Sequence, residues 1–251
     1  INTGVAEAQL INTAVGLALE GWRPIAYSIA PFCTARPYEQ IRFGVAYHRL
    51  PVMIVGAGGG FTYAQAGVTH HAPDDLALMS ALPGMTVVAP GGPDELERLM
   101  PQMLELESPS YMRVGKFGEP KVGGDSPVIL GKARKLKDGE KVAVLTLGDI
   151  APHIRAAVET LHAMGYSPGL FHFHTIKPLD VDIFAEINAK YKHVVVLEEC
   201  IPQGGLFEKL CHWKAMNNSS LKLSRFGAPD GFILGSPSRE ELRARIGVNP
   251  E

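Results

Sequence analysis

The sequence predicts an α/β protein built from two domains, each with a mostly parallel sheet flanked by helices. Short apolar segments that suit buried strands alternate with longer segments of helical periodicity along most of the chain. The length of 251 residues is sufficient for two ordinary domains. Residues 119–127 contain two prolines, two glycines and little periodicity. We therefore predict a linker there, between a domain at residues 1–118 and a second at residues 128–251.

The composition is that of a globular protein, with 46% hydrophobic and 20% charged residues. A formal net charge of -2 provides no basic surface for nucleic acid. No run of about 18 apolar residues is present to span a membrane. The three cysteines, Cys33, Cys200 and Cys211, are far apart and form no CxxC motif. They favour a reducing, cytoplasmic compartment over a disulfide framework or a zinc site.

The elements of the first domain follow from periodicity and from turn residues. Residues 1–4 lack the features of a signal peptide and are interpreted as the end of a strand, so the chain begins inside a domain. Residues 7–20 are apolar on several faces and predict a buried helix that Gly21 ends. Strands are predicted at residues 24–29, 52–55, 85–89 and 111–114, and a glycine-rich loop at residues 56–71. Helices are predicted at residues 37–47, at residues 75–82 and from Asp94. Asp94 is the predicted cap of the last helix, and Pro101 is expected to break or kink it.

The second domain repeats the alternation of strands and helices. Strands are predicted at residues 142–147, 169–174, 194–197 and 221–225. Helices are predicted from Asp149, at residues 181–191 and 206–216, and at residues 238–246 with Ser238 as the cap. Strands that alternate with helices imply parallel sheets with right-handed crossovers.

Two residues of the first domain are candidates for ligand contacts. Glu7 lies among apolar neighbours, where a carboxylate is costly unless it is neutral or paired. Burial raises the pKa of a carboxyl group, so such a residue can share a proton with a ligand base; the alternative is a helix N-terminal acid favoured by the dipole. Phe32 follows a predicted strand, where open α/β sheets bind ligands. Its ring can stack on a heteroaromatic ligand, or it can be a core aromatic.

Further polar residues lie near the ends of predicted elements. His70 and His71 end the glycine-rich loop and suit substrate contact, metal binding or a simple surface position. Arg113 and Lys116 lie at the end of the last predicted strand of the first domain and suit an anionic group such as a phosphate, or are a solvated basic pair. The glycines at residues 58–60 lack the spacing of a dinucleotide motif.

Four polar residues of the second domain are interpreted without a functional role. His172 and His174 share one face of a predicted strand and have no third metal ligand, so we predict structural roles for them. Glu198 and Glu199 follow a strand end and are interpreted as surface residues.

A set of motifs resembles the transketolase family over nearly the whole chain. The segments that resemble its pyrimidine-binding domain are Gly4-Val5-Ala6-Glu7, Pro31-Phe32-Cys33-Thr34, Tyr38-Glu39-Gln40-Ile41-Arg42, Gly67-Val68-Thr69-His70, Asp75-Leu76-Ala77-Leu78 and Met85-Thr86-Val87-Val88-Ala89-Pro90. The segments that resemble its C-terminal domain are His174-Thr175-Ile176-Lys177-Pro178-Leu179-Asp180, Val194-Val195-Val196-Leu197-Glu198-Glu199 and Gly204-Gly205-Leu206. Residues 1–118 and 128–251 would be these two domains.

The resemblance implies residue roles. Glu7 matches the glutamate that hydrogen-bonds the aminopyrimidine of thiamine diphosphate, and Phe32 matches the aromatic residue stacked on that ring. His70 matches a histidine near the substrate hydroxyls, and with Glu7 it is expected to be catalytic. Arg36 and one or both of Arg113 and Lys116 are expected to contact the substrate. The departures from the family pattern, which concern substrate recognition, are Ala8 for a glutamine, Ile29 for an aromatic residue and Ala66 for an acid.

One family motif is missing. The family binds the diphosphate through Mg²⁺ with a Gly-Asp-Gly motif and a later Asn, and Gly148-Asp149-Ile150 is not that motif. The resemblance therefore implies that this chain binds the pyrimidine half of the cofactor and no metal. The diphosphate and Mg²⁺ ligands are expected on a partner subunit, as in split transketolases, or on a removed part of this chain. An obligate α2β2 assembly is the expected arrangement.

The resemblance implies transfer of a two-carbon ketol unit between sugars that are expected to be phosphorylated. A first alternative is the β subunit of a 2-oxo acid dehydrogenase, or an enzyme similar to 1-deoxyxylulose-5-phosphate synthase. Thr69-His70 and the Asp75-Leu76-Ala77-Leu78 stretch favour the transketolase. A second alternative is a non-catalytic scaffold subunit, which the substitution at Ala66 favours and the presence of Glu7 and Phe32 argues against.

Overall fold

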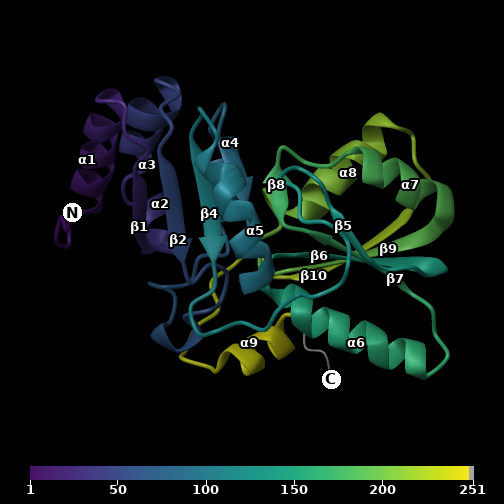
Figure 1. Cartoon of the computed structure of the whole chain (residues 1–251). Coiled ribbons are helices and arrows are strands. Elements are labelled where there is room, and N and C mark those ends of the chain that lie inside the picture. The colour runs from purple at the N-terminus through teal and green to yellow at the C-terminus, as the bar shows by residue number, and fades with distance from the viewer. Residues whose placement is uncertain (249–251) are drawn as a thin grey trace.

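The computed structural model describes residues 1–248 and shows two α/β units side by side, so the predicted fold class is confirmed (Figure 1). Each unit has a five-stranded sheet, with strand orders β1-β2-β4-β3-β8 and β10-β9-β6-β7-β5. The end of the predicted second domain, residues 249–251, lies outside the described residues.

The first sheet has four parallel strands that match the predicted apolar segments: β1 (Ile25–Ile29), β2 (Met53–Ala57), β3 (Thr86–Val88) and β4 (Ser110–Val114). Every residue of β2 is buried, because helices and loops cover both faces of a parallel sheet. A fifth strand, β8 (Thr175–Lys177), pairs antiparallel with β3. The first sheet therefore contains a strand from the second half of the chain.

The second sheet has the same design. Its parallel strands are β6 (Lys141–Leu147), β7 (Gly169–Phe173), β9 (Tyr191–Glu198) and β10 (Lys222–Gly227). The edge strand β5 (Arg134–Lys137) pairs antiparallel with β7. Neither β5 nor β8 is predicted from the sequence, because each is short and carries lysine or arginine in place of an apolar run.

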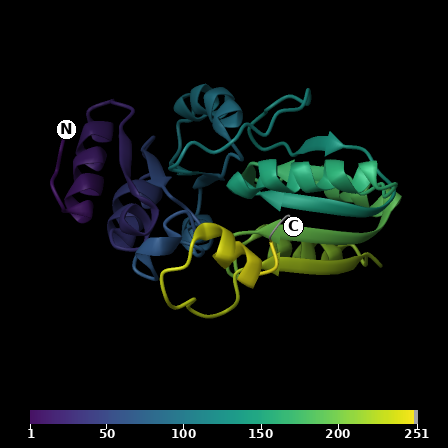
Figure 2. The same cartoon turned by 90° about the horizontal axis from the view of Figure 1, so that it is seen from below.

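The helices of the first unit are α1 (Glu7–Leu19), α2 (Ala30–Thr34), α3 (Tyr38–Gln40), the π-helix η1 (Ile41–Tyr47), α4 (Asp75–Ala81) and α5 (Pro93–Leu104), with a 3-10 turn η2 (Ala64–Ala66) in the glycine-rich loop. The helices of the second unit are α6 (Ala151–Ala163), α7 (Asp182–Lys190), α8 (Leu206–Met216) and α9 (Arg239–Arg245), with a 3-10 turn η3 (Gly148–Ile150) before α6. Seen from below, α9 lies across the junction of the two units (Figure 2).

Two sequence predictions about the first unit are wrong in detail, and one of the two alternatives for Pro101, a break in the helix, is excluded. Residues 1–4 form no strand. Asp94 does not cap α5, because its carboxylate accepts hydrogen bonds from the backbone amides of Val122 (3.0 Å) and Gly123 (2.9 Å) in the predicted linker. Pro101 does not end α5, which continues to Leu104. By contrast, Ser238 caps α9 as predicted, in a capping box with Glu241.

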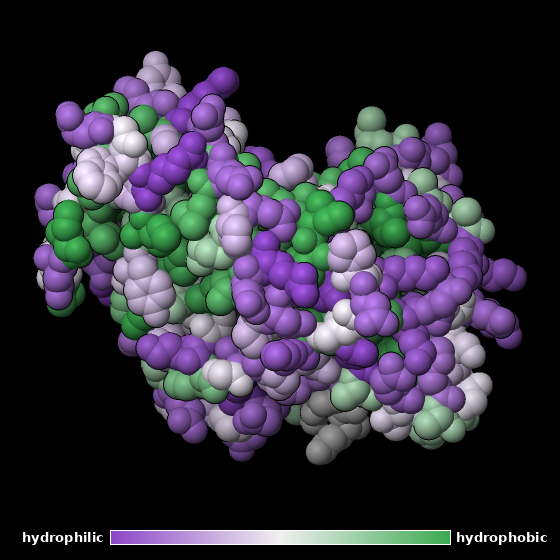
Figure 3. Space-filling model, in the orientation of Figure 1, coloured by the Kyte–Doolittle hydropathy of each residue, from purple (hydrophilic) through white to green (hydrophobic). Residues whose placement is uncertain are grey.

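Helix α1 is not buried within this chain, although its sequence is apolar on several faces. Only Ile11, Ala14 and Ala18 are buried, since the helix packs on β1 and η1 with one side. Around it, Val5 is 95% and Leu19 66% exposed. Figure 3 shows apolar groups, in green, at the surface of this part of the first unit. The additional apolar faces predicted as core are therefore open surface in the single chain.

The two units are joined by a shared core and by a buried ionic group. The largest buried apolar cluster includes Leu76 and Met79 of α4 together with Leu206 of α8. Glu95 on α5 pairs with Arg134 (2.7 Å) on β5, and its other oxygen lies 3.0 Å from His172 Nε2 on β7. Burial raises the pKa of Glu95, but the facing His172 and Arg134 outweigh it and hold that pKa below its ordinary range.

Candidate active site

The first contact within the candidate site joins Glu7, Arg36 and Phe32. Gly4, with a positive φ of 71°, turns the chain before α1, so that Glu7 lies in the first turn, where the helix dipole favours an acid. Nη1 of Arg36 donates to Oε1 of Glu7 over 3.1 Å. The guanidinium carbon of Arg36 also lies 3.8 Å from the centre of the Phe32 ring. The Glu7 side chain is 14% exposed and that of Arg36 is 52% exposed.

His70 belongs to the same group of side chains. Its ring centre lies 5.1 Å from that of Phe32, in an edge-on arrangement. Oγ1 of Thr69 lies 2.9 Å from Nδ1 of His70, which fixes the orientation of the imidazole. The neighbouring His71 is buried, and its Nε2 lies 3.1 Å from the backbone oxygen of Ala64. His71 therefore holds the loop, and His70 faces the site.

Tyr63 is a site residue that the sequence analysis missed. Its ring centre lies 5.9 Å from that of His70 and 5.9 Å from that of Phe117. The ammonium of Lys116 lies 5.6 Å from the centre of the same ring. Tyr63 thus connects Lys116 to the group formed by Phe32 and His70. An aromatic residue in a glycine-rich loop is a signal that could have drawn attention to it.

Arg113 is not part of this group, although the sequence analysis made it a candidate substrate ligand. Its Nε donates to both carboxylate oxygens of Asp75 at 3.0 Å, and Nη2 donates to the backbone oxygen of Ala72 at 3.0 Å. Nη1 donates to the backbone oxygen of Glu199 at 3.4 Å. Burial lowers the pKa of Arg113, but the adjacent Asp75 carboxylate outweighs it and raises that pKa well above its ordinary value. All three nitrogens thus have protein partners, and the side chain is 6% exposed.

The three glycines at residues 58–60 have a packing role. A Cβ on Gly59 would overlap the side chain of Arg113, and one on Gly60 would lie 2.6 Å from Oε2 of Glu199. Gly58 and Gly60 also have positive φ angles of 74° and 59°. Glycine at these positions allows both charged side chains to contact the loop backbone.

Glu199 is buried, so its interpretation as a surface residue is wrong. Its Oε2 accepts from the backbone amide of Phe61 at 2.9 Å and from Arg239 at 2.9 Å, and its Oε1 accepts from Arg243 at 2.5 Å. Burial raises the pKa of Glu199, but Arg239 and Arg243 outweigh it and hold that pKa below its ordinary range. The second unit thereby holds the loop that carries Tyr63 and His70.

Glu198 is also buried, and the same correction applies to it. Its carboxylate accepts from Nε of Arg225 at 3.0 Å and from the backbone amide of Leu206 at 2.7 Å. His172 and His174 are both fully buried, in agreement with the structural roles predicted for them.

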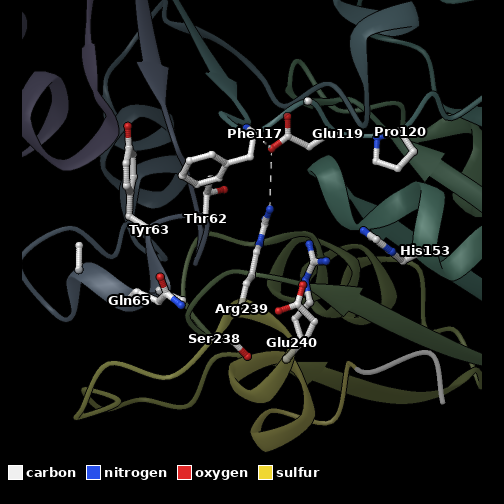
Figure 4. A pocket seen from close by; sticks show the side chains of 14 residues that line it. Thr62, Tyr63, Gln65, Phe117, Glu119, Pro120, His153, Ser238, Arg239 and Glu240 are labelled. Atoms are coloured by element: carbon white, nitrogen blue, oxygen red, sulfur yellow. Dashed lines mark hydrogen bonds and ion pairs between the residues drawn. The ribbon is translucent and has the colours of Figure 1, made fainter.

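A cavity of about 500 Å³ lies beside this loop and is lined by residues of both units (Figure 4). Thr62, Tyr63 and Phe117 lie on one side and His153 on the other, with Arg239 between them. Arg239 extends from α9 toward Glu119, with 3.9 Å between charged atoms, and pairs with Asp149 at 2.8 Å. Since Arg239 and Arg243 face Asp149, Glu199 and Glu119, the positive charges of the cavity are paired within the protein.

The arrangement of Glu7 and Phe32 fits the aminopyrimidine ring of thiamine diphosphate. The space between the carboxylate and the ring already contains a planar group that hydrogen-bonds the one and stacks on the other, namely the Arg36 guanidinium. A flat heteroaromatic ring with hydrogen-bonding nitrogens can make the same two contacts.

Within residues 1–248 no cluster of three or more His, Cys, Asp or Glu side chains is arranged to hold a metal ion. No helix of the described chain is long and apolar enough to cross a membrane.

Two family models match the chain: the transketolase pyrimidine-binding domain at residues 1–117 and the transketolase C-terminal domain at residues 131–251. A subunit of the apulose-4-phosphate transketolase of Phocaeicola vulgatus is 28% identical over 253 residues, which span 100% of this chain and 80% of that protein. The 6-deoxy-6-sulfo-D-fructose transketolase subunit SqwH of Clostridium sp. is 32% identical over 233 residues, or 92% and 72% of the two chains.

A solved structure shows the same fold. It is described as a split gene transketolase, inactive beta4 tetramer, and it matches with a TM-score of 0.87 and 29% identity over 100% of this chain and 79% of that one. The family models together cover both α/β units, and these relatives are aligned over most of their length. The chain belongs to the transketolase family and corresponds to the C-terminal half of a transketolase.

Proposed function

We propose that this chain is the C-terminal subunit of a split transketolase. It binds the aminopyrimidine half of thiamine diphosphate and acts with a partner subunit that carries the ligands of the diphosphate and Mg²⁺. The observation that carries the proposal is the grouping of Glu7, Phe32 and His70, in which Arg36 contacts both Glu7 and Phe32, and Phe32 contacts His70. The similarity to two transketolase subunits over most of their length supports it.

Each residue of the group has a task that its position supports. Glu7, at the start of α1, hydrogen-bonds a ring nitrogen of the aminopyrimidine and holds or returns a proton there. Phe32 provides a flat apolar face for the ring. Thiamine diphosphate, when bound, supplies the electron sink for breaking and making the carbon–carbon bond.

His70 and Lys116 serve the substrate in this proposal. Nδ1 of His70 is engaged with Thr69, and among residues 1–248 its Nε2 has no hydrogen-bond partner, which leaves it for a substrate hydroxyl. Lys116 lies at the edge of the group, over Tyr63, with its charge exposed. We propose that Lys116, and not Arg113, contacts a substrate phosphate. The Arg113 guanidinium is already hydrogen-bonded to the Asp75 carboxylate.

The surface of the first unit supports an interface with other subunits. Trp22 and Tyr27 are 66% and 59% exposed, and they add to the exposed Val5 and Leu19. Adjacent exposed apolar groups are typical of association surfaces. We propose self-association through this surface and an α2β2 assembly with the partner. The related split transketolase, described as a β4 tetramer, supports association between copies of the C-terminal chain.

Reconstitution tests the proposal. The chain, mixed with a purified diphosphate-binding transketolase subunit from the same source, thiamine diphosphate and Mg²⁺, is expected to transfer a ketol unit from a ketose to an aldose. Each subunit alone is expected to be inactive. Product formation is followed by mass spectrometry with a panel of phosphorylated and unphosphorylated sugars. Full activity of the chain without a partner would contradict the split-enzyme proposal.

A second candidate is synthesis of 1-deoxyxylulose 5-phosphate. The synthase of Chlorobaculum tepidum is 28% identical over 254 residues, which span 100% of this chain but only 40% of that protein. The same reconstituted sample separates the two activities. Release of CO₂ from pyruvate in the presence of glyceraldehyde 3-phosphate indicates the synthase, and ketol transfer without decarboxylation indicates the transketolase.

A further inference from the structure

Arg36 occupies a position between the two residues to which the pyrimidine ring is assigned. Its Nη1 lies 3.1 Å from Oε1 of Glu7, and its guanidinium carbon lies 3.8 Å from the centre of the Phe32 ring. A single planar group therefore makes both a hydrogen bond to the carboxylate and a stacking contact with the ring. These are the two contacts that the proposed function requires of the aminopyrimidine.

The contact between Arg36 and Glu7 has a physical reason. The Glu7 side chain is only 14% exposed, and a carboxylate with so little water requires a partner. Arg36 is the only ion-pair partner of Glu7 within residues 1–248. A guanidinium is suited to this task, since it is planar, permanently charged and able to lie on an aromatic face.

We propose that Arg36 is a placeholder that occupies the pyrimidine site until the cofactor displaces it. The inference rests on the proposed function, because it assumes that the ring binds Glu7 and Phe32. The guanidinium and the ring compete for the same carboxylate and the same aromatic face. Arg36 therefore lowers the apparent affinity for the cofactor, and it pairs with the Glu7 carboxylate whenever no cofactor is bound. Its side chain is 52% exposed and is free to move into solvent on displacement.

The size of the effect follows from the two contacts that must be broken. The ion pair, of which the Arg36 side chain is 52% exposed, and the cation–π contact together correspond to a change of about 3- to 30-fold in an equilibrium constant. Replacement of Arg36 by alanine removes this competition. The apparent dissociation constant for the aminopyrimidine should therefore fall about 3- to 30-fold.

The test uses two probes and matched variants. The first probe is the free aminopyrimidine alcohol of thiamine, titrated into the chain alone and followed by NMR. The second is thiamine diphosphate with Mg²⁺, titrated calorimetrically into the chain with its partner subunit. The variants are Arg36→Ala and the control Arg42→Ala, since Arg42 is an exposed arginine near an aromatic ring, 5.7 Å from Phe43, without a carboxylate partner among residues 1–248.

Tighter binding of both probes by Arg36→Ala, with Arg42→Ala equal to the wild type, is the expected result. Equal or weaker binding by Arg36→Ala, while the wild type binds, would overturn the placeholder and leave the proposed function intact. If neither probe binds to the wild type or to either variant, the proposed function is overturned, and this inference with it. Circular dichroism of each variant confirms that it is folded.

Discussion

Glu199, at the end of a strand in the second unit, accepts a hydrogen bond from the backbone amide of Phe61 in the first unit at 2.9 Å. Phe61 lies in the loop that carries Tyr63 and His70, and Arg239 and Arg243 hold the Glu199 carboxylate in place. The C-terminal unit therefore contributes to the site by positioning a loop, although none of its residues touches Phe32 or His70 in the contacts described. This relationship makes the loop geometry testable apart from the cofactor contacts.

Gly60→Ala tests the role of the loop. The new Cβ would lie 2.6 Å from Oε2 of Glu199, at a residue with a φ of 59°. We expect the loop to shift and the KM for the sugar to rise at least tenfold, while the affinity for thiamine diphosphate stays within a factor of two. Gly84→Ala is the control, since Gly84 has a φ of 71° but nothing within 4 Å of an added Cβ. Equal effects of the two variants would show that backbone strain alone is responsible.

Glu7→Gln tests the proton-holding role. The amide keeps the size of the side chain but cannot hold or return a proton to the ring nitrogen. Ketol transfer by the reconstituted enzyme is expected to fall by about 10²–10⁴-fold, with circular dichroism unchanged. Turnover within a factor of three of the wild type would remove Glu7 from the catalytic residues.

Phe32→Ala tests the stacking face. Loss of the ring should weaken binding of thiamine diphosphate by up to about 3 kcal/mol, on the scale of burying an apolar side chain. Phe32→Tyr keeps the flat face and is expected to bind normally. Calorimetry in the presence of the partner subunit gives both values, and an unchanged affinity in Phe32→Ala would place the cofactor elsewhere.

Arg113→Met and Lys116→Met separate stability from substrate binding. Loss of Arg113 leaves the buried Asp75 carboxylate without a cation, so the free energy of unfolding should fall by about 3–5 kcal/mol. Loss of the exposed Lys116 should change it by less than about 0.5 kcal/mol. Denaturant unfolding measures both. Lys116→Met should instead raise the KM for phosphorylated sugars, and a stable Arg113→Met protein with the same KM defect would restore Arg113 as a substrate ligand.

His174 makes stability depend on pH. Burial lowers the pKa of His174 from 6.5 to about 4, so at pH values between these two the unfolded chain binds a proton that the folded chain does not. The stability contributed by the neutral imidazole is thus present above pH 6.5 and declines as the pH falls to about 4, by up to about 3 kcal/mol.

Urea unfolding between pH 4 and 7 measures this dependence. His174→Gln should remove part of the slope in that range, and replacement of the exposed His48 by glutamine should leave the slope unchanged. A slope that is identical in the wild type and in His174→Gln would show that other groups cause the acid sensitivity.

The parts of the fold that the sequence predicts are those with a local cause. The apolar run of β2 and the Ser238 cap of α9 depend on neighbouring residues, and both are found where expected. The antiparallel strands β5 and β8 depend on partners more than 30 residues away, and their lysines and arginines conceal them. Such pairings are decided by tertiary contacts that periodicity does not show.

In the candidate site, too, some residues are predicted from the sequence and others depend on tertiary contacts. The motifs that resemble the transketolase family identify Glu7, Phe32 and His70, and the structure brings these three together with Arg36. They do not reveal that Arg113 pairs with Asp75, because a basic residue at a strand end has the same sequence signature whether it faces solvent or a buried acid. The apolar faces of α1 are a further example, since sequence periodicity does not distinguish a buried face from an exposed apolar one.

The most direct test of the account is calorimetric titration of thiamine diphosphate with Mg²⁺ into this chain, first alone and then with the diphosphate-binding subunit. We expect tight binding only when both subunits are present, because we propose that this chain provides the pyrimidine contacts and that its partner provides the others. Equally tight binding to the chain alone would contradict it by revealing a diphosphate site within this chain. Absence of binding with the partner present would contradict the assignment of Glu7 and Phe32 to the cofactor.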